Sequence, residues 1–258
     1  MAATSHGDSG NVQLIGLRGV PDVSPGDNLA ALVVSAAASS GVTLTDGDIL
    51  VITQKVVSKA EGRLVDLREV EPSELARRLA EPYNKDPRYV EVVLRESVRI
   101  VRMERGIIIS QTRHGFVCAN AGVDASNVSG GEVACLLPLD SDASARRLRA
   151  ELRERVGADL AVIVSDSFGR PWRMGIVNVA IGVAGMRPLL DYRGQPDDYG
   201  RVMHASILSV ADEIASAAEL VAGKVNRAPF VVVRGYEYPR GEGAARDLVM
   251  DPAMDLFR

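Results

Sequence analysis

The chain of 258 residues carries 34 acidic and 30 basic side chains, and its net charge of −4 argues against general nucleic-acid affinity. A hydrophobic content of 47% with 25% charged residues is that of an ordinary globular protein, long enough to bury a substantial core. Cys118 and Cys135 have no zinc or disulfide spacing, which indicates a reduced, cytoplasmic protein. No apolar run reaches the ~20 residues that span a bilayer. Residues 1–11 predict a disordered tail without a signal peptide, followed by one domain over 12–258 or two intimately joined lobes.

The hydrophobic pattern of the first half predicts short strands and three helices. Apolar runs predict strands at residues 12–17, 49–53, 98–101, 106–110 and 115–119. Helices are expected at residues 28–40, after Pro72-Ser73 and after Asp86-Pro87, where Asp is a preferred N-cap and Pro suits the first turn.

The second half predicts helices at 141–157, 207–222 and 244–250, and strands at 160–164, 175–185 and 230–234. The glycine-rich segment 175–185 is typical of a buried strand that lies close to other backbone. The chain has few long helices to cover the segment 175–185 and the other apolar strands, so we expect a second copy of the chain to cover them in a homodimer. The polar segment 191–200 is expected to be a lid or substrate loop. Strands and helices alternate unevenly, so we expect an α+β fold of mixed sheets with flanking helices.

Two aspartates follow apolar runs and are surrounded by small and amide residues. Asp124 follows residues 116–119 and Asp166 follows residues 160–164, so each is expected where a strand opens into a loop. Carboxylate oxygens are hard ligands for Mg²⁺ or Mn²⁺. Ser167 adds a hydroxyl, and Arg170 can donate to a phosphate or substrate carboxylate. The alternative is that both aspartates are turn or capping residues, and spacing does not decide between the two.

A basic, polar segment follows the predicted strand 49–53. Gln54, Lys55, Ser58 and Lys59 suit a phosphate or carboxylate site, although a solvated basic turn explains them equally. The three histidines are scattered, and the sequence has no Ser/His/Asp constellation, GxGxxG motif or phosphate-loop motif.

Four segments together resemble the coenzyme F420-0:γ-glutamyl ligases. They are residues 57–63 (VSKAEGR), 120–128 (NAGVDASNV), 165–170 (SDSFGR) and 210–214 (VADEI), within a resemblance that runs from about Gly19 to the C-terminus. Actinobacterial relatives carry an additional flavin-reductase-like domain, so this chain is expected to be the stand-alone ligase.

The resemblance implies a ligase that depends on GTP and on Mg²⁺ or Mn²⁺, with potassium as a further candidate ion. Such an enzyme adds L-glutamate to coenzyme F420-0 through an acyl phosphate, and then adds further glutamates through γ-linkages. The resemblance also implies an intertwined homodimer with a family-specific fold. Two other functions remain open: phosphoryl transfer to a different carboxylate or amine, and non-catalytic binding of a nucleotide or deazaflavin.

The resemblance assigns Asp124, Asp166 and Ser167 to the metal ions. It implies nucleotide contacts for Val20, Pro21, Asp22, Val23, Gln54, Lys55, Lys59, Asn127, Ala222, Gly223, Lys224, Val225, Asn226 and Arg227. Lys224 replaces a glutamate that binds a second metal ion in an archaeal relative, which puts that second site in question. Gln54 stands where serine is common. No general base is identified, and Asp197, Asp198 and Glu213 are weak candidates.

Overall fold

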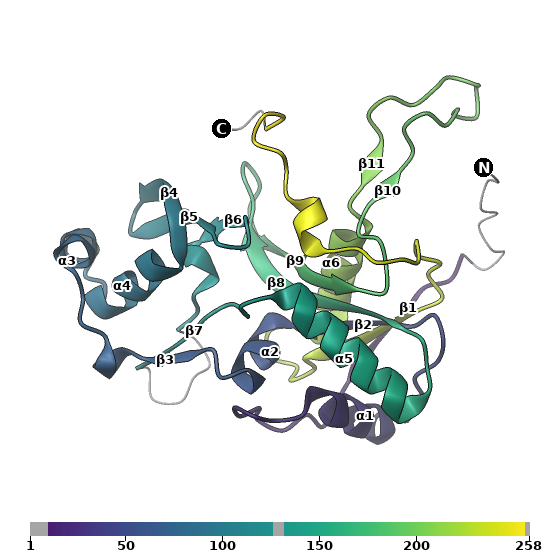
Figure 1. The fold of residues 1–258 in the computed structure, drawn as a ribbon, viewed down its shortest axis with the longest axis horizontal. Helices are drawn as coiled ribbons and strands as arrows, with labels where there is room; N and C mark the ends of the chain where they lie inside the picture. The colour runs from purple at the N-terminus through teal and green to yellow at the C-terminus, as the bar shows by residue number, and fades with distance from the viewer. Residues whose placement is uncertain (1–9, 126–131, 256–258) are drawn as a thin grey trace.

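The computed structural model describes residues 10–125 and 132–255 and is built around a five-stranded sheet of order β1-β12-β2-β8-β9 (Figure 1). Its strands are β1 (Gln13–Leu17), β12 (Phe230–Arg234), β2 (Ile49–Thr53), β8 (Ala161–Gly169) and β9 (Ile176–Ala184). The strands β2 and β8 are parallel, and all other neighbours are antiparallel. The mixed α+β architecture expected from the sequence is confirmed.

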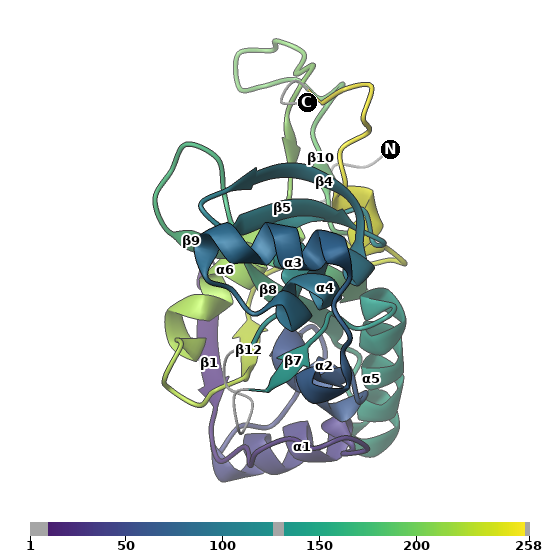
Figure 2. The same ribbon diagram turned by 90° about the vertical axis from the view of Figure 1, so that its left-hand side faces the viewer.

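Helices cover both faces of this sheet. The helices α1 (Leu29–Ser39) and α5 (Ser141–Val156) pack on one face, and α6 (Val210–Ala222) packs on the other (Figures 1 and 2). Alternate residues of β8 face the two cores: Val162 contacts the side of α1 and α5, and Ile163 contacts the side of α6. The site is therefore carried by a sheet that is buried on both faces.

A smaller group of elements lies beside the sheet. It contains α3 (Glu74–Ala80), α4 (Pro87–Glu96), the sheet of β4 (Ser97–Glu104), β5 (Ile107–Thr112) and β6 (Val117–Ala119), and the pair β3 (Leu64–Asp66) and β7 (Val133–Cys135). It has its own buried core, in which Leu67, Val93 and Ile108 are each at most 2% exposed. The two views place this smaller lobe against one end of the large sheet (Figures 1 and 2).

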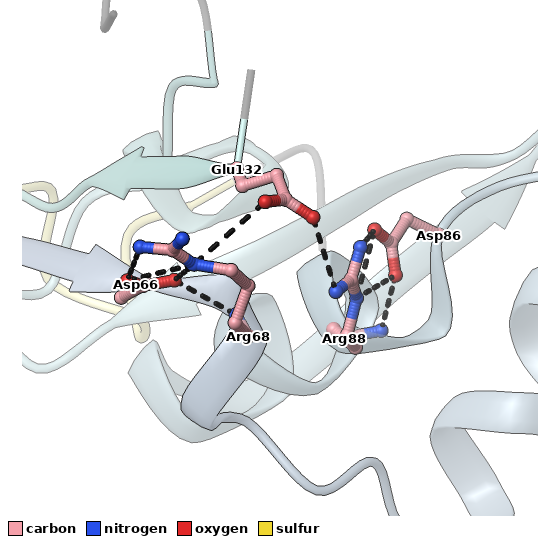
Figure 3. A network of polar contacts seen from close by, with 5 residues as sticks. All are labelled: Asp66, Arg68, Asp86, Arg88 and Glu132. Atoms are coloured by element: carbon pink, nitrogen blue, oxygen red, sulfur yellow. Dashed lines mark hydrogen bonds and ion pairs between the residues drawn. The ribbon is translucent and has the colours of Figure 1, made fainter. Parts of the chain in front are cut away.

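An ion-pair network holds the start of β7 in the smaller lobe (Figure 3). The guanidinium groups of Arg68 and Arg88 bind Asp66 and Asp86, and both also approach Glu132, at 3.7 and 3.6 Å. The hydrogen bonds from Arg68 lower the pKa of Asp66 to about 2. Glu132 directly precedes β7, so the network lies at the start of the strand whose Cys135 pairs with Asp124.

Several expected elements differ in extent from those observed. The basic segment after β2 is not a turn but the helix α2 (Gln54–Ala60). Ile207 and Leu208 form β11 with β10 (Leu190–Asp191), so α6 begins only at Val210. The last helix shrinks to the 3₁₀ turn η4 (Ala245–Leu248). The remaining 3₁₀ turns are η1 (Leu67–Glu69), η2 (Glu81–Tyr83) and η3 (Asn120–Gly122).

The glycine-rich strand β9 is covered within the chain. The helices α5 and α6 both contact it, and a Cβ on Gly182 would lie 2.4 Å from the backbone oxygen of Ser141. The expected close approach to other backbone is confirmed. Because α5 and α6 of the same chain cover this strand, residues 175–185 no longer argue for a homodimer.

Among the residues that the structure describes, none of the helices is both long and apolar enough to cross a membrane.

Candidate functional site

A cavity of about 930 Å³ opens where β2 and β8 end. Because these strands are parallel, their carboxyl ends meet at one edge of the sheet, the place where ligands bind in many α/β sheets. The antiparallel strand β12 begins at the same edge, so Ala228 and Pro229 also line the cavity.

Most of the residues predicted from the sequence meet in this cavity. Its walls contain Val20, Pro21, Asp22, Val23, Gln54, Lys55, Lys59, Asp124, Asp166, Ser167, Gly223, Lys224 and Arg227. The described lining does not include Arg170, Ala222, Val225 or Asn226, and Asn127 lies outside the described residues. The side chain of Arg170 bonds instead to the carbonyl oxygen of Met174 within the β8–β9 turn, at 3.4 Å.

Asp166 lies inside β8 and not in a loop after it. The strand β8 continues to Gly169 because its second half pairs with β9, beyond the last contact with β2 at Ser165. Burial is the main reason why the pKa of Asp166 is raised to about 6; Asp124 raises it further, while Lys224 and Lys55 lower it. A partly buried carboxylate with a raised pKa is stabilised in its ionised form by a cation that binds beside it.

Asp124 is held by a strained turn. Asn120, Ala121 and Gly122 have φ angles of 52°, 53° and 70°, a left-handed conformation that is unfavourable for alanine. The hydroxyl of Tyr89 donates to the carbonyl of Val123 at 2.8 Å. Asp124 exchanges two backbone hydrogen bonds, of 2.9 and 2.7 Å, with Cys135 of β7. These contacts place its carboxylate at the cavity wall.

Lysines from α2 bring positive charge to the same wall. The ammonium of Lys55 lies 2.6 Å from a carboxylate oxygen of Asp124, and Lys59 follows one turn later. Gln54 has a structural role: its side chain is 3% exposed, and its amide donates to Ser58 and, at 3.0 Å, to the carbonyl of Leu136.

The two predicted nucleotide-contacting segments that lie farthest apart in sequence touch at the cavity. Arg227 donates to Asp22 at 3.1 Å and so joins the turn at 20–23 to the loop after α6.

Four polar residues that line the cavity were not predicted from the sequence: Thr53, Ser165, Asn178 and Glu219. The Ser165 hydroxyl is buried and has no hydrogen-bond partner among the described residues. Asn178 was detectable as a polar residue inside an apolar strand, and Glu219 as a carboxylate one turn before the loop after α6. The weak candidates for a general base, Asp197, Asp198 and Glu213, do not belong to the described lining.

Asn178 and Glu219 form a closed ring with Ser167 and Lys224. The Ser167 hydroxyl donates to Asn178 Oδ1 at 2.7 Å, and Asn178 Nδ2 donates to Glu219 Oε2 at 2.9 Å. The ammonium of Lys224 donates to the Ser167 oxygen and lies 3.4 Å from Glu219 Oε1. Each polar side chain of the ring therefore contacts two others.

The donor sets fit one divalent cation better than two. Asp124 and Asp166 offer hard carboxylate oxygens, and Mg²⁺ commonly takes one or two carboxylates while phosphates and water complete its shell. Within residues 10–125 and 132–255, no three or more His, Cys, Asp or Glu side chains are grouped so that they could hold a metal ion by themselves. Ser167, which the resemblance assigns to a metal, already binds the ammonium of Lys224.

Comparison with known proteins places the chain in a family. The family model described as F420-0:Gamma-glutamyl ligase matches residues 18–235. The "Coenzyme F420:L-glutamate ligase" of Methanothermobacter thermautotrophicus is 47% identical over 250 residues, which cover 96% of this chain and 99% of the relative. The protein of the same name from Methanopyrus kandleri is 50% identical over 241 residues, covering 92% and 93%. That from Methanocaldococcus jannaschii is 40% identical over 250 residues, covering 96% and 97%. The chain is therefore an enzyme, a ligase that belongs to the F420-0:γ-glutamyl ligase family.

Proposed function

We propose that this chain joins L-glutamate to coenzyme F420-0 and then adds further glutamates through γ-linkages, with GTP and a divalent metal ion as requirements. One observation carries the proposal beyond family membership. The cavity collects Asp124, Asp166, Lys55 and Lys59 from three separate segments of the chain. Carboxylates beside ammonium groups suit a metal-bound polyphosphate.

The reaction requires an activated carboxylate. A carboxylate oxygen of the acceptor attacks the γ-phosphorus of GTP, the bond to the β-phosphate oxygen breaks, and GDP leaves. The glutamate nitrogen then attacks the acyl phosphate, loses a proton, and releases inorganic phosphate as the amide forms. A bound Mg²⁺ or Mn²⁺ would neutralise phosphate charge during the transfer.

The side chains divide this work. Asp124 and Asp166 are the residues that would hold the cation. Lys55 and Lys59 would place fixed positive charge around the phosphates, where a charged hydrogen bond contributes about 1.5–3 kcal/mol. The contact between Asp22 and Arg227 joins the two segments, at 20–23 and after α6, that would bind the nucleotide.

We also propose that the protein acts as a homodimer. The edge strand β4 exposes three apolar residues within positions 98–101: Val98 is 64% exposed, Ile100 41% and Val101 42%. An apolar edge strand favours pairing with another chain, and a second copy is the partner that the family resemblance implies.

A ligation assay read by mass spectrometry tests the function. The protein is incubated with F420-0, L-glutamate and Mn²⁺ or Mg²⁺, with GTP or ATP, and with and without K⁺. We expect products that grow in glutamate-sized steps together with GDP. GTP turnover only with a different acceptor would indicate another phosphoryl-transfer enzyme. Tight nucleotide or F420-0 binding without turnover would indicate a binding protein.

A further inference from the structure

The ring on the α6 side of the cavity contains a cation that belongs to the chain. Lys224 contacts two oxygen donors, Ser167 Oγ and Glu219 Oε1, and its side chain remains 59% exposed, so its ammonium can still meet a ligand in the cavity. Ser167 and Glu219 are held in turn by Asn178. A hard metal ion requires several oxygen donors that point to one place. Here the oxygens of Ser167 and Glu219 point to the ammonium of Lys224 instead.

The α6 side of the cavity already holds a cation of the chain. Asp124 and Asp166 supply two carboxylates, of which Asp124 lies 2.6 Å from the ammonium of Lys55, and Lys59 lines the same cavity one turn further along α2. On the α6 side, the carboxylate of Glu219 lies 3.4 Å from the ammonium of Lys224. A divalent cation among the oxygens of this ring would meet that positive charge at a few ångströms.

We propose that Lys224 is a built-in cation that takes the place of a second divalent ion, so that each chain binds one metal ion and not two. This inference rests on the proposed function, since it assumes metal binding at Asp124 and Asp166. The ammonium would face an anionic group of a substrate, a phosphate or a carboxylate. Unlike a second metal ion, this charge does not depend on the metal concentration.

Counting bound Mn²⁺ tests the inference without turnover. The full chain, with GDP equimolar to protein, is titrated with Mn²⁺, and free Mn²⁺ is followed by its electron paramagnetic resonance signal, with a GDP-only titration subtracted. We expect one Mn²⁺ per chain in the parent protein. Lys224→Glu removes the ammonium and supplies a carboxylate beside Ser167 and Glu219, so it should bind two.

Arg170→Glu is the matched control, because it makes the same charge reversal in the β8–β9 turn, outside the described lining of the cavity. It should leave the count at one. Two ions in this control would show that any added carboxylate recruits a metal, and would overturn the assignment to Lys224. A folded Lys224→Glu protein, checked by circular dichroism, that still binds one ion would overturn it as well.

The number of Mn²⁺ ions bound by the parent protein tests the inference even if Lys224→Glu does not fold. Two Mn²⁺ ions per parent chain, with ligation intact, would overturn this inference and leave the proposed function standing. No bound Mn²⁺ and no GTP-dependent ligation would overturn the proposed function, and this inference with it.

Discussion

At the level of single residues, the carboxylate of Asp166 is the group whose ionisation should be most sensitive to a bound cation. Its carboxylate is placed by β8 among buried groups and next to another aspartate, and its pKa is raised to about 6. In the absence of a cation, burying this charge destabilises the folded protein.

The pH dependence of stability follows from this raised pKa. An unfolded aspartate titrates near ~3.9, so between about pH 4 and 6 the folded protein holds a proton that the unfolded chain has lost. Stability should therefore fall as the pH rises through this window. One pKa unit corresponds to about 1.4 kcal/mol, so the ionised carboxylate costs up to about 3 kcal/mol above pH 6.

Asp166→Asn removes that cost. With EDTA present, urea unfolding should show the variant about 1–3 kcal/mol more stable than the parent at pH 7.5 and equal to it at pH 4. A difference that is the same at both pH values would show that ionisation of Asp166 is not its cause.

The sequence predicted much of this site because its parts are local motifs. Asp124, Asp166 and Lys55 were recognisable from their positions after apolar runs and from the family resemblance. Glu219 and Asn178 were not, because their importance arises only when α6 packs on β9 and brings their side chains together. Gln54 resembled a ligand-binding residue, but its amide is used to join α2 to the segment after β7.

At the scale of elements, the turn η3 sets the position of Asp124. Three consecutive left-handed residues turn the chain between β6 and the aspartate. Gly122 also allows close packing, since a Cβ there would lie 2.8 Å from the side chain of Leu137.

Gly122→Ala should therefore disturb the site. Left-handed strain costs about 1–2 kcal/mol for a residue with a Cβ, and overpacking adds about 1–3 kcal/mol. We expect a loss of stability of about 2–5 kcal/mol by urea unfolding and Mn²⁺ affinity at least ~10-fold weaker in the presence of GDP.

Gly26→Ala is the matched control, because Gly26 also has a positive φ, of 89°, but nothing lies within 4 Å of its added Cβ. It should lose only about 1–2 kcal/mol and keep its Mn²⁺ affinity. Equal effects of the two substitutions would mean that packing against Leu137 does not position Asp124.

Helices whose start is marked by an N-cap residue, or whose apolar residues follow the helical period, were predicted well. The N-caps Asp86 and Ser73 begin α4 and α3 as expected. The helical period of residues 141–157 predicts that Ala145, Leu148, Leu152 and Val156 face inward; the first three are buried, and Val156 at the end of α5 is exposed. The extent of β8 was not predictable, since Ser165, Asp166 and Ser167 are polar and the strand continues beyond Ser165 only by pairing with β9. Likewise Ile207 and Leu208 fit the helical period of α6 but pair with β10 instead.

At the scale of the whole molecule, β4 is the element least explained by the single chain. It is an edge strand whose apolar residues are exposed, although the smaller lobe behind it has a complete core. A homodimer that covers β4 accounts for this surface.

Sedimentation at micromolar concentration should show a species of twice the 27.5 kDa chain mass. A variant with Val98→Lys and Ile100→Lys should sediment as a folded monomer, because both side chains are exposed in the single chain. Leu220→Lys, at a residue 80% exposed on α6, should remain dimeric. A parent protein that is monomeric throughout would contradict the dimer, and a dimer lost only in Leu220→Lys would place the interface on α6.

Melting temperatures of the parent, Asp124→Asn and Asp166→Asn proteins, each with and without Mn²⁺ plus GTP, test the metal and nucleotide site most directly. A ligand at 100 times its dissociation constant stabilises the folded state by about 2.7 kcal/mol. We therefore expect a clear rise in the parent, a much smaller rise in both variants, and no ligation by either variant. If the aspartates were only turn or capping residues, asparagine would replace them well. Variants that remain active and respond to Mn²⁺ plus GTP as the parent does would contradict the site proposed here.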